Sequence, residues 1–259
     1  MDTGVLHAMV IGLTVLIALA VGLVLARTTR FWLNDESQLE QLERSTISRA
    51  WVPVLAGLVL AAVAAWAFPL HQIVAGDGGW SAYAPLSGTT FTPPQPNSAD
   101  RIGTACFLGL VAGTTPFLFT TDILVRRLPD RITLPTTLLG LAAIIIGSTL
   151  GASHMWFTAF FSGTIALIAF GLLHLLGRLL RKKTMGLGDV KLSFIVFATA
   201  GLFDPWAPAV VFVAMMLIAG VWALLGVLRA RRLRGVTIAF GPAMLSGMWL
   251  GSVTAPFVL

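Results

Sequence analysis

The chain has 259 residues, of which 57% are hydrophobic and only 11% are charged, and its mean hydropathy is +0.89. This composition excludes a water-soluble globular protein with a polar surface, so the bilayer must be the solvent of the fold. The formal net charge is +6, but in a membrane chain the placement of Lys and Arg matters more than their sum, and nucleic acid is not an expected partner.

Eight apolar runs approach the length of roughly 20 residues that a helix needs to cross the hydrocarbon core. They predict an all-α, polytopic membrane protein with about eight transmembrane helices. In chain order the predicted spans are 5–26, 51–70, 102–124, 134–150, 156–176, 186–203, 206–228 and 236–258. No basic segment precedes the first run, which is also long for a signal peptide, so it is expected to be a retained helix.

The basic residues predict the orientation of these spans. If the eight spans alternate from an outside N-terminus, 16 of the 17 Lys and Arg residues fall on one side, and only Arg101 falls on the other. Because basic loops resist translocation, we expect the basic side to be cytoplasmic and both termini to lie outside.

The chain divides into two expected parts. Residues 1–100 hold the first two spans, a short cytoplasmic helix at about 34–49 and a turn-rich outside loop at about 71–100, whose Gly and Pro content cannot cross a bilayer. Residues 101–259 hold the other six spans. The acids near the start of the 34–49 helix and the bases near its end are typical of an ordinary solvated helix.

Neither cysteine nor histidine points to a metal site. Cys106 is the only cysteine, which excludes an intramolecular disulfide and a multi-cysteine zinc site. The four histidines are scattered without the spacing of metal ligands. No metal and no cofactor is therefore expected.

Two carboxylates are the candidates for chemistry, because ionisable residues at membrane depth are costly and mark functional sites. Asp122 lies near the cytoplasmic end of the third apolar run, and Asp189 ends a Gly-Leu-Gly-Asp sequence at the start of the sixth. The fourth and fifth spans form a hairpin between them, and a hairpin returns the chain to the face that it left. Both carboxylates are thus expected at one level of the membrane.

If these two carboxylates meet, the pair would share one proton, since two adjacent carboxylates do not both ionise easily. The charged member would activate water and the protonated member would donate to a scissile carbonyl. Gly186 and Gly188 would let a substrate or a neighbouring helix come close. Structural alternatives remain: Asp122 could pair with Arg126 four residues on, and Asp189 could cap the helix that follows it.

Three segments, in this order, resemble the type IV prepilin peptidases, a family of Gly-x-Gly-Asp intramembrane aspartic peptidases. Asp122 and the segment from Leu128 to Pro135 resemble the first catalytic motif of the family, and residues 185–191 resemble the second. The third is Phe-Gly-Pro at the start of the last helix. The residues that the resemblance assigns a supporting role are Gly186, Gly188, Lys191, Leu128, Pro129, Asp130, Pro135, Phe240, Gly241 and Pro242.

The resemblance implies an aspartic endopeptidase in the bacterial cytoplasmic membrane, with Asp122 and Asp189 as its catalytic pair. It would remove the short basic leader from type IV pilin-like precursors at the cytoplasmic face, in support of pilus, pseudopilus or secretion-system assembly. The 34–49 helix could then also dock that leader. Larger members carry a domain with two Cys-x-x-Cys pairs, which this chain lacks. A zinc-bearing domain is therefore not expected. The sequence does not decide whether the chain also methylates the new N-terminus.

Two other functions compete with this interpretation. A presenilin-like protease shares Gly-x-Gly-Asp but pairs it with Tyr-Asp and Pro-Ala-Leu motifs, and the sole tyrosine here is Tyr83 in the predicted outside loop. A transporter or assembly scaffold would use the two aspartates to relay protons or to pair with arginines. The oligomeric state and the particular precursor are not given by the sequence.

Overall fold

The computed structural model describes residues 3–32, 51–69, 96–126, 128–180, 186–230 and 240–258. Within these ranges the regular structure is helical and no strand is present. The all-α prediction is confirmed for this part of the chain. The predicted helix at 34–49 and all but the last few residues of the predicted loop at 71–100 lie outside the described residues.

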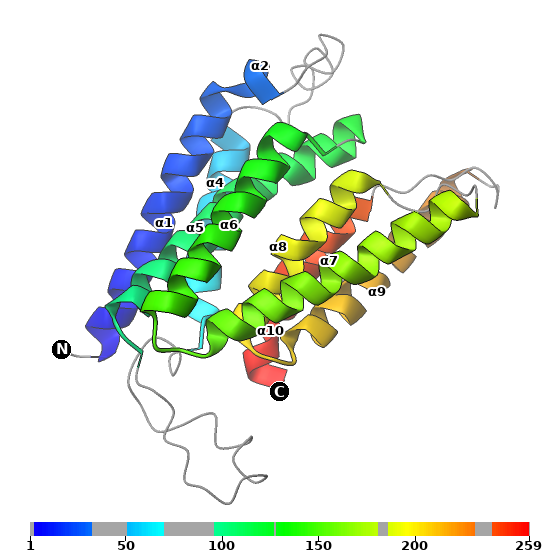
Figure 1. Ribbon diagram of the computed structural model, residues 1–259. Helices are drawn as coiled ribbons and strands as arrows, with labels where there is room; N and C mark the ends of the chain where they lie inside the picture. Colours follow the sequence, from blue (N-terminus) through cyan, green and yellow to red (C-terminus); the bar gives the residue numbers. More distant parts are fainter. Residues whose placement is uncertain are drawn as a thin grey trace, which may run out of the picture.

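The long helices follow the predicted apolar runs in order. They are α1 Thr3–Arg27, α4 Trp51–Ala67, α5 Ser98–Val125, α6 Asp130–Leu150, α7 Met155–Leu179, α8 Leu187–Phe203, α9 Ala207–Ala230 and α10 Phe240–Val258, and the short α2 Thr29–Trp32 follows α1. Successive long helices run in opposite directions, so the start of α1 and the end of α10 lie at the same end of the bundle (Figure 1).

Five of these helices, α1, α5, α6, α7 and α9, are long and apolar enough to cross a membrane. This fits the predicted multi-pass membrane protein. The count of eight spans is not confirmed, because α4 and α8 have only 17 residues each and would measure roughly 26 Å at 1.5 Å per residue. Many large apolar side chains on α7 and α9 are exposed, as expected of a surface that faces lipid.

Helix α5 begins earlier than its apolar run suggests. It starts at Ser98, after Asn97, whose side chain accepts a hydrogen bond from the backbone of Asp100 while the Asp100 carboxylate accepts one from the backbone of Asn97. This reciprocal capping box stabilises a helix start that contains polar residues. The last residues of the predicted outside loop therefore belong to α5.

Helix α5 is the centre of one half of the bundle, and α1, α4 and α6 pack on it. It approaches α1 closely because two glycines face that helix. A Cβ on Gly109 would lie 2.7 Å from the Thr14 carbonyl oxygen, and one on Gly113 would lie 2.9 Å from that of Ala18. Small residues at such a crossing let two backbones come together, which is a common mode of helix association in membranes.

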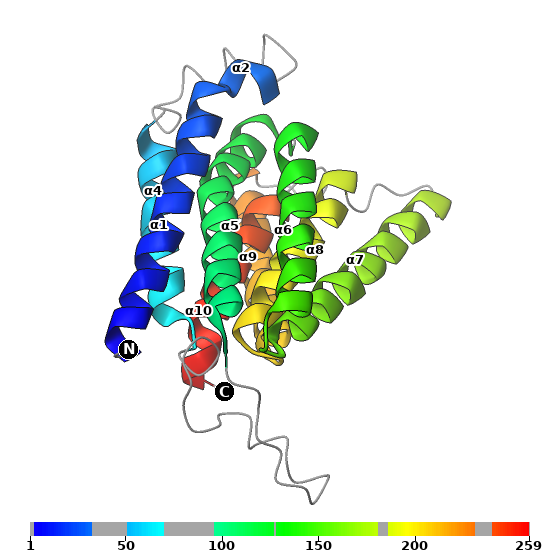
Figure 2. The same ribbon diagram turned by 60° about the vertical axis from the view of Figure 1, so that its left-hand side comes forward.

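The second half of the bundle contains α7, α8, α9 and α10, with α8 against α7 and α10 against α9 and α8 (Figure 2). The two halves meet where α10 packs on α5 and α4, and where α6 packs on α8. Because the helices alternate in direction, α5 ends at the same end of the bundle at which α6, α8 and α10 begin (Figure 1). We call this the Asp122 end.

Candidate active site

Asp122 lies in the last turn of α5 and is buried, with 5% of its surface exposed. Its carboxylate oxygen Oδ2 accepts a hydrogen bond of 3.1 Å from the backbone N–H of Gly241, at the start of α10. The helix ends at Val125, and the next residue, Arg126, adopts a left-handed conformation with φ of 54° and donates its backbone N–H to the Asp122 carbonyl oxygen. The carboxylate is thus held by α10, and Arg126 meets Asp122 through the backbone.

Asp189 lies in the first turn of α8 and is partly exposed. Its carboxylate accepts a hydrogen bond of 3.3 Å from the backbone N–H of Gly186, the residue before the helix. Asp189 therefore lies inside α8 and does not precede it, and it satisfies one of the N–H groups that a helix start leaves without an intrahelical acceptor. The capping alternative is therefore present in the structure.

The two aspartates lie at the same end of the bundle, as the hairpin argument predicts. Helices α6 and α7 form the connection that runs to the far end and returns. Asp122 belongs to the last turn of α5 and Asp189 to the first turn of α8, and both turns lie at the Asp122 end. The fold therefore brings together two carboxylates that are separated by an entire helical hairpin in the sequence.

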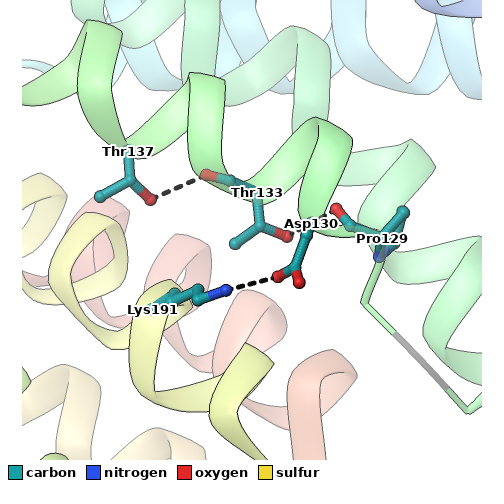
Figure 3. A network of polar contacts seen from close by, with 5 residues as sticks. All are labelled: Pro129, Asp130, Thr133, Thr137 and Lys191. Carbon is teal, nitrogen blue, oxygen red and sulfur yellow. Dashed lines mark hydrogen bonds and ion pairs between the residues drawn. The ribbon is translucent and has the colours of Figure 1, made fainter. Parts of the chain in front are cut away.

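The connection between α5 and α6 packs against the first turn of α8. Pro129 is the residue before α6, and its carbonyl oxygen accepts a hydrogen bond from the Thr133 hydroxyl. Asp130 opens the helix, and its carboxylate lies 2.7 Å from the Lys191 ammonium of α8 (Figure 3). The close-up shows that Lys191 reaches across from α8 to the first turn of α6.

The two glycines of the Gly-Leu-Gly-Asp sequence have different surroundings. A Cβ on Gly188 would lie 3.1 Å from the Leu128 Cβ, so this glycine faces the α5 to α6 connection. Gly186 is exposed, and a Cβ there would lie 3.4 Å from the Asp189 carboxylate. Gly188 thus allows α8 to approach Leu128, and Gly186 leaves the side of Asp189 open.

Phe240, Gly241 and Pro242 form the first turn of α10 at the Asp122 end. Proline is well tolerated there because the N–H groups of the first turn have no intrahelical acceptor, so the N–H that proline lacks costs no hydrogen bond. The third predicted motif therefore lies beside the first, with the Gly241 N–H in direct contact with the Asp122 carboxylate.

Pro135 differs from its expected position. The predicted fourth span begins at residue 134, but α6 begins at Asp130, so Pro135 lies inside the helix. The helix starts earlier because Pro129 stands before it in an extended conformation, and Ile132 and Thr133 donate backbone hydrogen bonds to the Pro129 carbonyl oxygen. Pro135 is exposed.

Two contacts near the site were not predicted from the sequence. The Trp249 indole N–H of α10 donates to the Thr115 hydroxyl of α5 over 3.1 Å, and the Arg131 guanidinium of α6 donates to the Phe31 carbonyl of α2 and lies over the Phe31 ring. The threonines of α5 could have predicted the first contact, because polar side chains within an apolar helix usually face another helix. Nothing in the local sequence pairs Arg131 with Phe31.

The described residues contain no group of three or more His, Cys, Asp or Glu side chains that could hold a metal ion. Cys106 lies within α5 as a free, partly buried thiol.

In a comparison with protein families, the type IV leader peptidase family matches residues 108–225. This segment runs from the middle of α5 into α9 and includes both aspartates. The predicted family resemblance is confirmed over this segment, and the family implies a peptidase. No curated protein and no solved structure matches the chain.

Proposed function

We propose that this chain, whose residues 108–225 match the type IV leader peptidase family, is a membrane aspartic endopeptidase with Asp122 and Asp189 as its catalytic pair. The observation that carries the proposal is the placement of the two carboxylates at one end of the helical bundle, Asp122 in the last turn of α5 and Asp189 in the first turn of α8. Carboxylates at membrane depth are costly, and their pairing within a segment matched by a peptidase family supports chemistry over a structural role.

The proposed reaction divides acid and base work between the pair. The ionised carboxylate removes a proton from a water molecule, which attacks the scissile carbonyl carbon, while the protonated carboxyl gives its proton to the carbonyl oxygen. The resulting tetrahedral diol collapses as a proton passes to the departing amide nitrogen, and the carbon–nitrogen bond breaks. The two aspartates exchange roles during turnover, so neither is assigned permanently as acid or base.

The supporting residues hold the two catalytic segments together in this proposal. Leu128, Pro129, Asp130 and Lys191 keep the first turn of α8 against the start of α6, while Phe240, Gly241 and Pro242 place the first turn of α10 beside Asp122. The exposed start of α8 at Gly186 offers room for an extended substrate backbone. We place this catalytic core in the six helices of residues 101–259.

The proposed substrates are type IV pilin-like precursors, which join a short basic leader to an apolar helix. The apolar helix would lie in the bilayer beside the exposed apolar surface of the bundle, and the scissile bond would then reach the Asp122 end. Arg27 and Arg178 lie in the last turns of α1 and α7, at this same end, which supports a cytoplasmic orientation by the distribution of basic residues. We therefore propose cleavage at the cytoplasmic face of the inner membrane.

Co-expression with candidate pilin-like precursors tests the proposal. Leader removal would be followed by gel shift and mass for the wild type, Asp122→Asn and Asp189→Asn, at matched amounts in the membrane. Asp204→Asn is the control, because Asp204 follows α8 at the opposite end of the bundle, where its carboxylate accepts a hydrogen bond from the Trp206 backbone N–H.

The expected result is cleavage by the wild type and by Asp204→Asn, and none by the other two variants. Cleavage that survives either change at the Asp122 end would remove that aspartate from the mechanism. If the wild type cleaves no pilin-like precursor, the result favours a transporter or scaffold over a peptidase.

A further inference from the structure

The first turn of α10 holds one oxygen of the Asp122 carboxylate. The Gly241 N–H donates to Asp122 Oδ2 over 3.1 Å, and both residues are buried. The first N–H groups of a helix have no intrahelical acceptor, so Gly241 can make this bond without breaking one within α10. This bond ties one oxygen of the Asp122 carboxylate to the backbone of α10.

The contact also excludes a side chain at position 241. A Cβ built on Gly241 would lie 2.6 Å from Asp122 Oδ2 and 3.2 Å from its Cγ. The nearest obstacle is thus the carboxylate itself. Any residue larger than glycine must displace either the carboxylate or the start of α10.

A second contact fixes α10 against α5 farther from the Asp122 end. The Trp249 indole N–H donates to the Thr115 hydroxyl, which is itself buried and donates to the Val111 carbonyl. Since the two helices are antiparallel, this contact lies about two turns from the first, or roughly 11 Å along the axis. Two contacts at that separation fix both the register and the rotation of α10 on α5.

We propose that Gly241 is a positioning residue for Asp122. Its backbone N–H holds Oδ2 and so fixes the orientation of the carboxylate, and the missing Cβ is what permits this contact. Helix α10 thereby sets the geometry of a catalytic group that belongs to α5. This inference rests on the proposed function, in which Asp122 is one of the catalytic pair.

The first test is Gly241→Ala in purified enzyme reconstituted into lipid nanodiscs, with a precursor that the wild type cleaves. Because misplacement of a catalytic group by about 1 Å can cost 100-fold in rate, kcat is expected to fall by at least about tenfold while KM changes by less than about twofold. Gly220→Ala in α9 is the matched control, since a Cβ there meets nothing within 4 Å. That variant is expected to keep wild-type kcat.

A second comparison separates positioning from general displacement of α10. A Cβ on Gly251 would lie 2.7 Å from the Val211 Cα of α9, so Gly251→Ala introduces a clash of similar size on the same helix, away from Asp122. It is expected to lower thermal stability while the folded enzyme retains most of its kcat. If Gly251→Ala and Gly241→Ala lower kcat equally, the effect is ordinary packing and the proposal is wrong.

A third variant covers the case in which Gly241→Ala does not fold. Replacing Gly241 by glycolic acid during cell-free synthesis converts its backbone amide into an ester, which removes the N–H and adds no side-chain atom. The expected outcome is a fall in kcat of at least about tenfold, as for any loss of catalytic alignment. Wild-type kcat in the ester variant would overturn the proposal.

These results are distinguishable from a failure of the proposed function. If Asp122→Asn cleaves the precursor normally, the catalytic pair is wrong, whatever the Gly241 variants do. If Asp122→Asn is inactive and both Gly241 variants match the wild type, only the positioning role is wrong.

Discussion

The Lys191 ammonium lies 2.7 Å from the Asp130 carboxylate and joins the first turn of α8 to the first turn of α6 (Figure 3). Lys191 follows Asp189 by two residues, so the ion pair holds the helical turn that carries one of the two candidate catalytic groups. The side chains are 35% and 68% exposed. An ion pair so exposed contributes at most about 1 kcal/mol to stability, and its larger effect is expected on orientation.

Loss of this ion pair should therefore reduce activity more than stability. Lys191→Ala and Asp130→Ala are each expected to lower kcat by roughly tenfold, through a small displacement of Asp189. The thermal unfolding of both variants in detergent should stay close to that of the wild type. Cleavage of a precursor by the purified variants, at several substrate concentrations, measures the effect.

The charge-reversed double variant, Lys191→Asp with Asp130→Lys, is the control for this prediction. It restores an ion pair with the opposite arrangement and is expected to recover part of the lost kcat. If the fold reduction in kcat of the double variant equals the product of the two single reductions, the two residues do not act through each other.

Gly188 should tolerate a side chain only when Leu128 becomes smaller. A Cβ on Gly188 would lie 3.1 Å from the Leu128 Cβ, so Gly188→Ala must push α8 away from the α5 to α6 connection by a few tenths of an ångström. A several-fold fall in kcat is expected. Combination with Leu128→Ala makes room and should recover activity, whereas no recovery would mean that Gly188 serves another purpose, such as contact with substrate.

The buried carboxylate of Asp100 gives a structural contrast to the candidate pair. Asp100 has no exposed surface and accepts four N–H donors at the opposite end of the bundle. The donors are the backbones of Asn97, Ala152 and Ser153 and the indole of Trp156. Asp100 thus joins the start of α5 to the connection between α6 and α7.

Asp100→Asn is expected to destabilise the protein without changing its chemistry. An amide group turns one acceptor oxygen into a donor that faces N–H groups, which should cost on the order of 3 kcal/mol. The melting temperature in detergent should fall, while kcat per folded molecule stays at the wild-type value. A loss of kcat at unchanged stability would contradict the structural role.

The sequence predicts the helices and the level of the two aspartates well, because both depend on long apolar runs and on alternation across a membrane. Helix α8 begins within one residue of its expected start, and Asp122 and Asp189 lie at the same end of the bundle as expected. The predicted boundary at Ile102 failed for a local reason. The Asn97 and Asp100 capping box extends α5 through residues that hydropathy excludes.

The lateral arrangement of the site could not be predicted in the same way. Hydropathy places Gly241 near the membrane level of Asp122, yet only the packing of α10 on α5 shows that its backbone N–H contacts the carboxylate. The contact between Trp249 and Thr115 is likewise shown only by the packing of α10 on α5. Such pairs depend on helix rotation, which small residues and side-chain fit determine, and a single sequence reports these only weakly.

The most direct measurement of the central claim is the single-turnover cleavage rate of Asp122→Asn, Asp189→Asn and the double variant in lipid nanodiscs, each verified by mass. If the two carboxylates act as one acid and base unit, each single change should lower the rate by on the order of 10³-fold or more, and the double change should lower it little further. A single variant that cleaves within about tenfold of the wild-type rate would contradict the account, because acid and base catalysis by that residue supplies at least about 10²-fold.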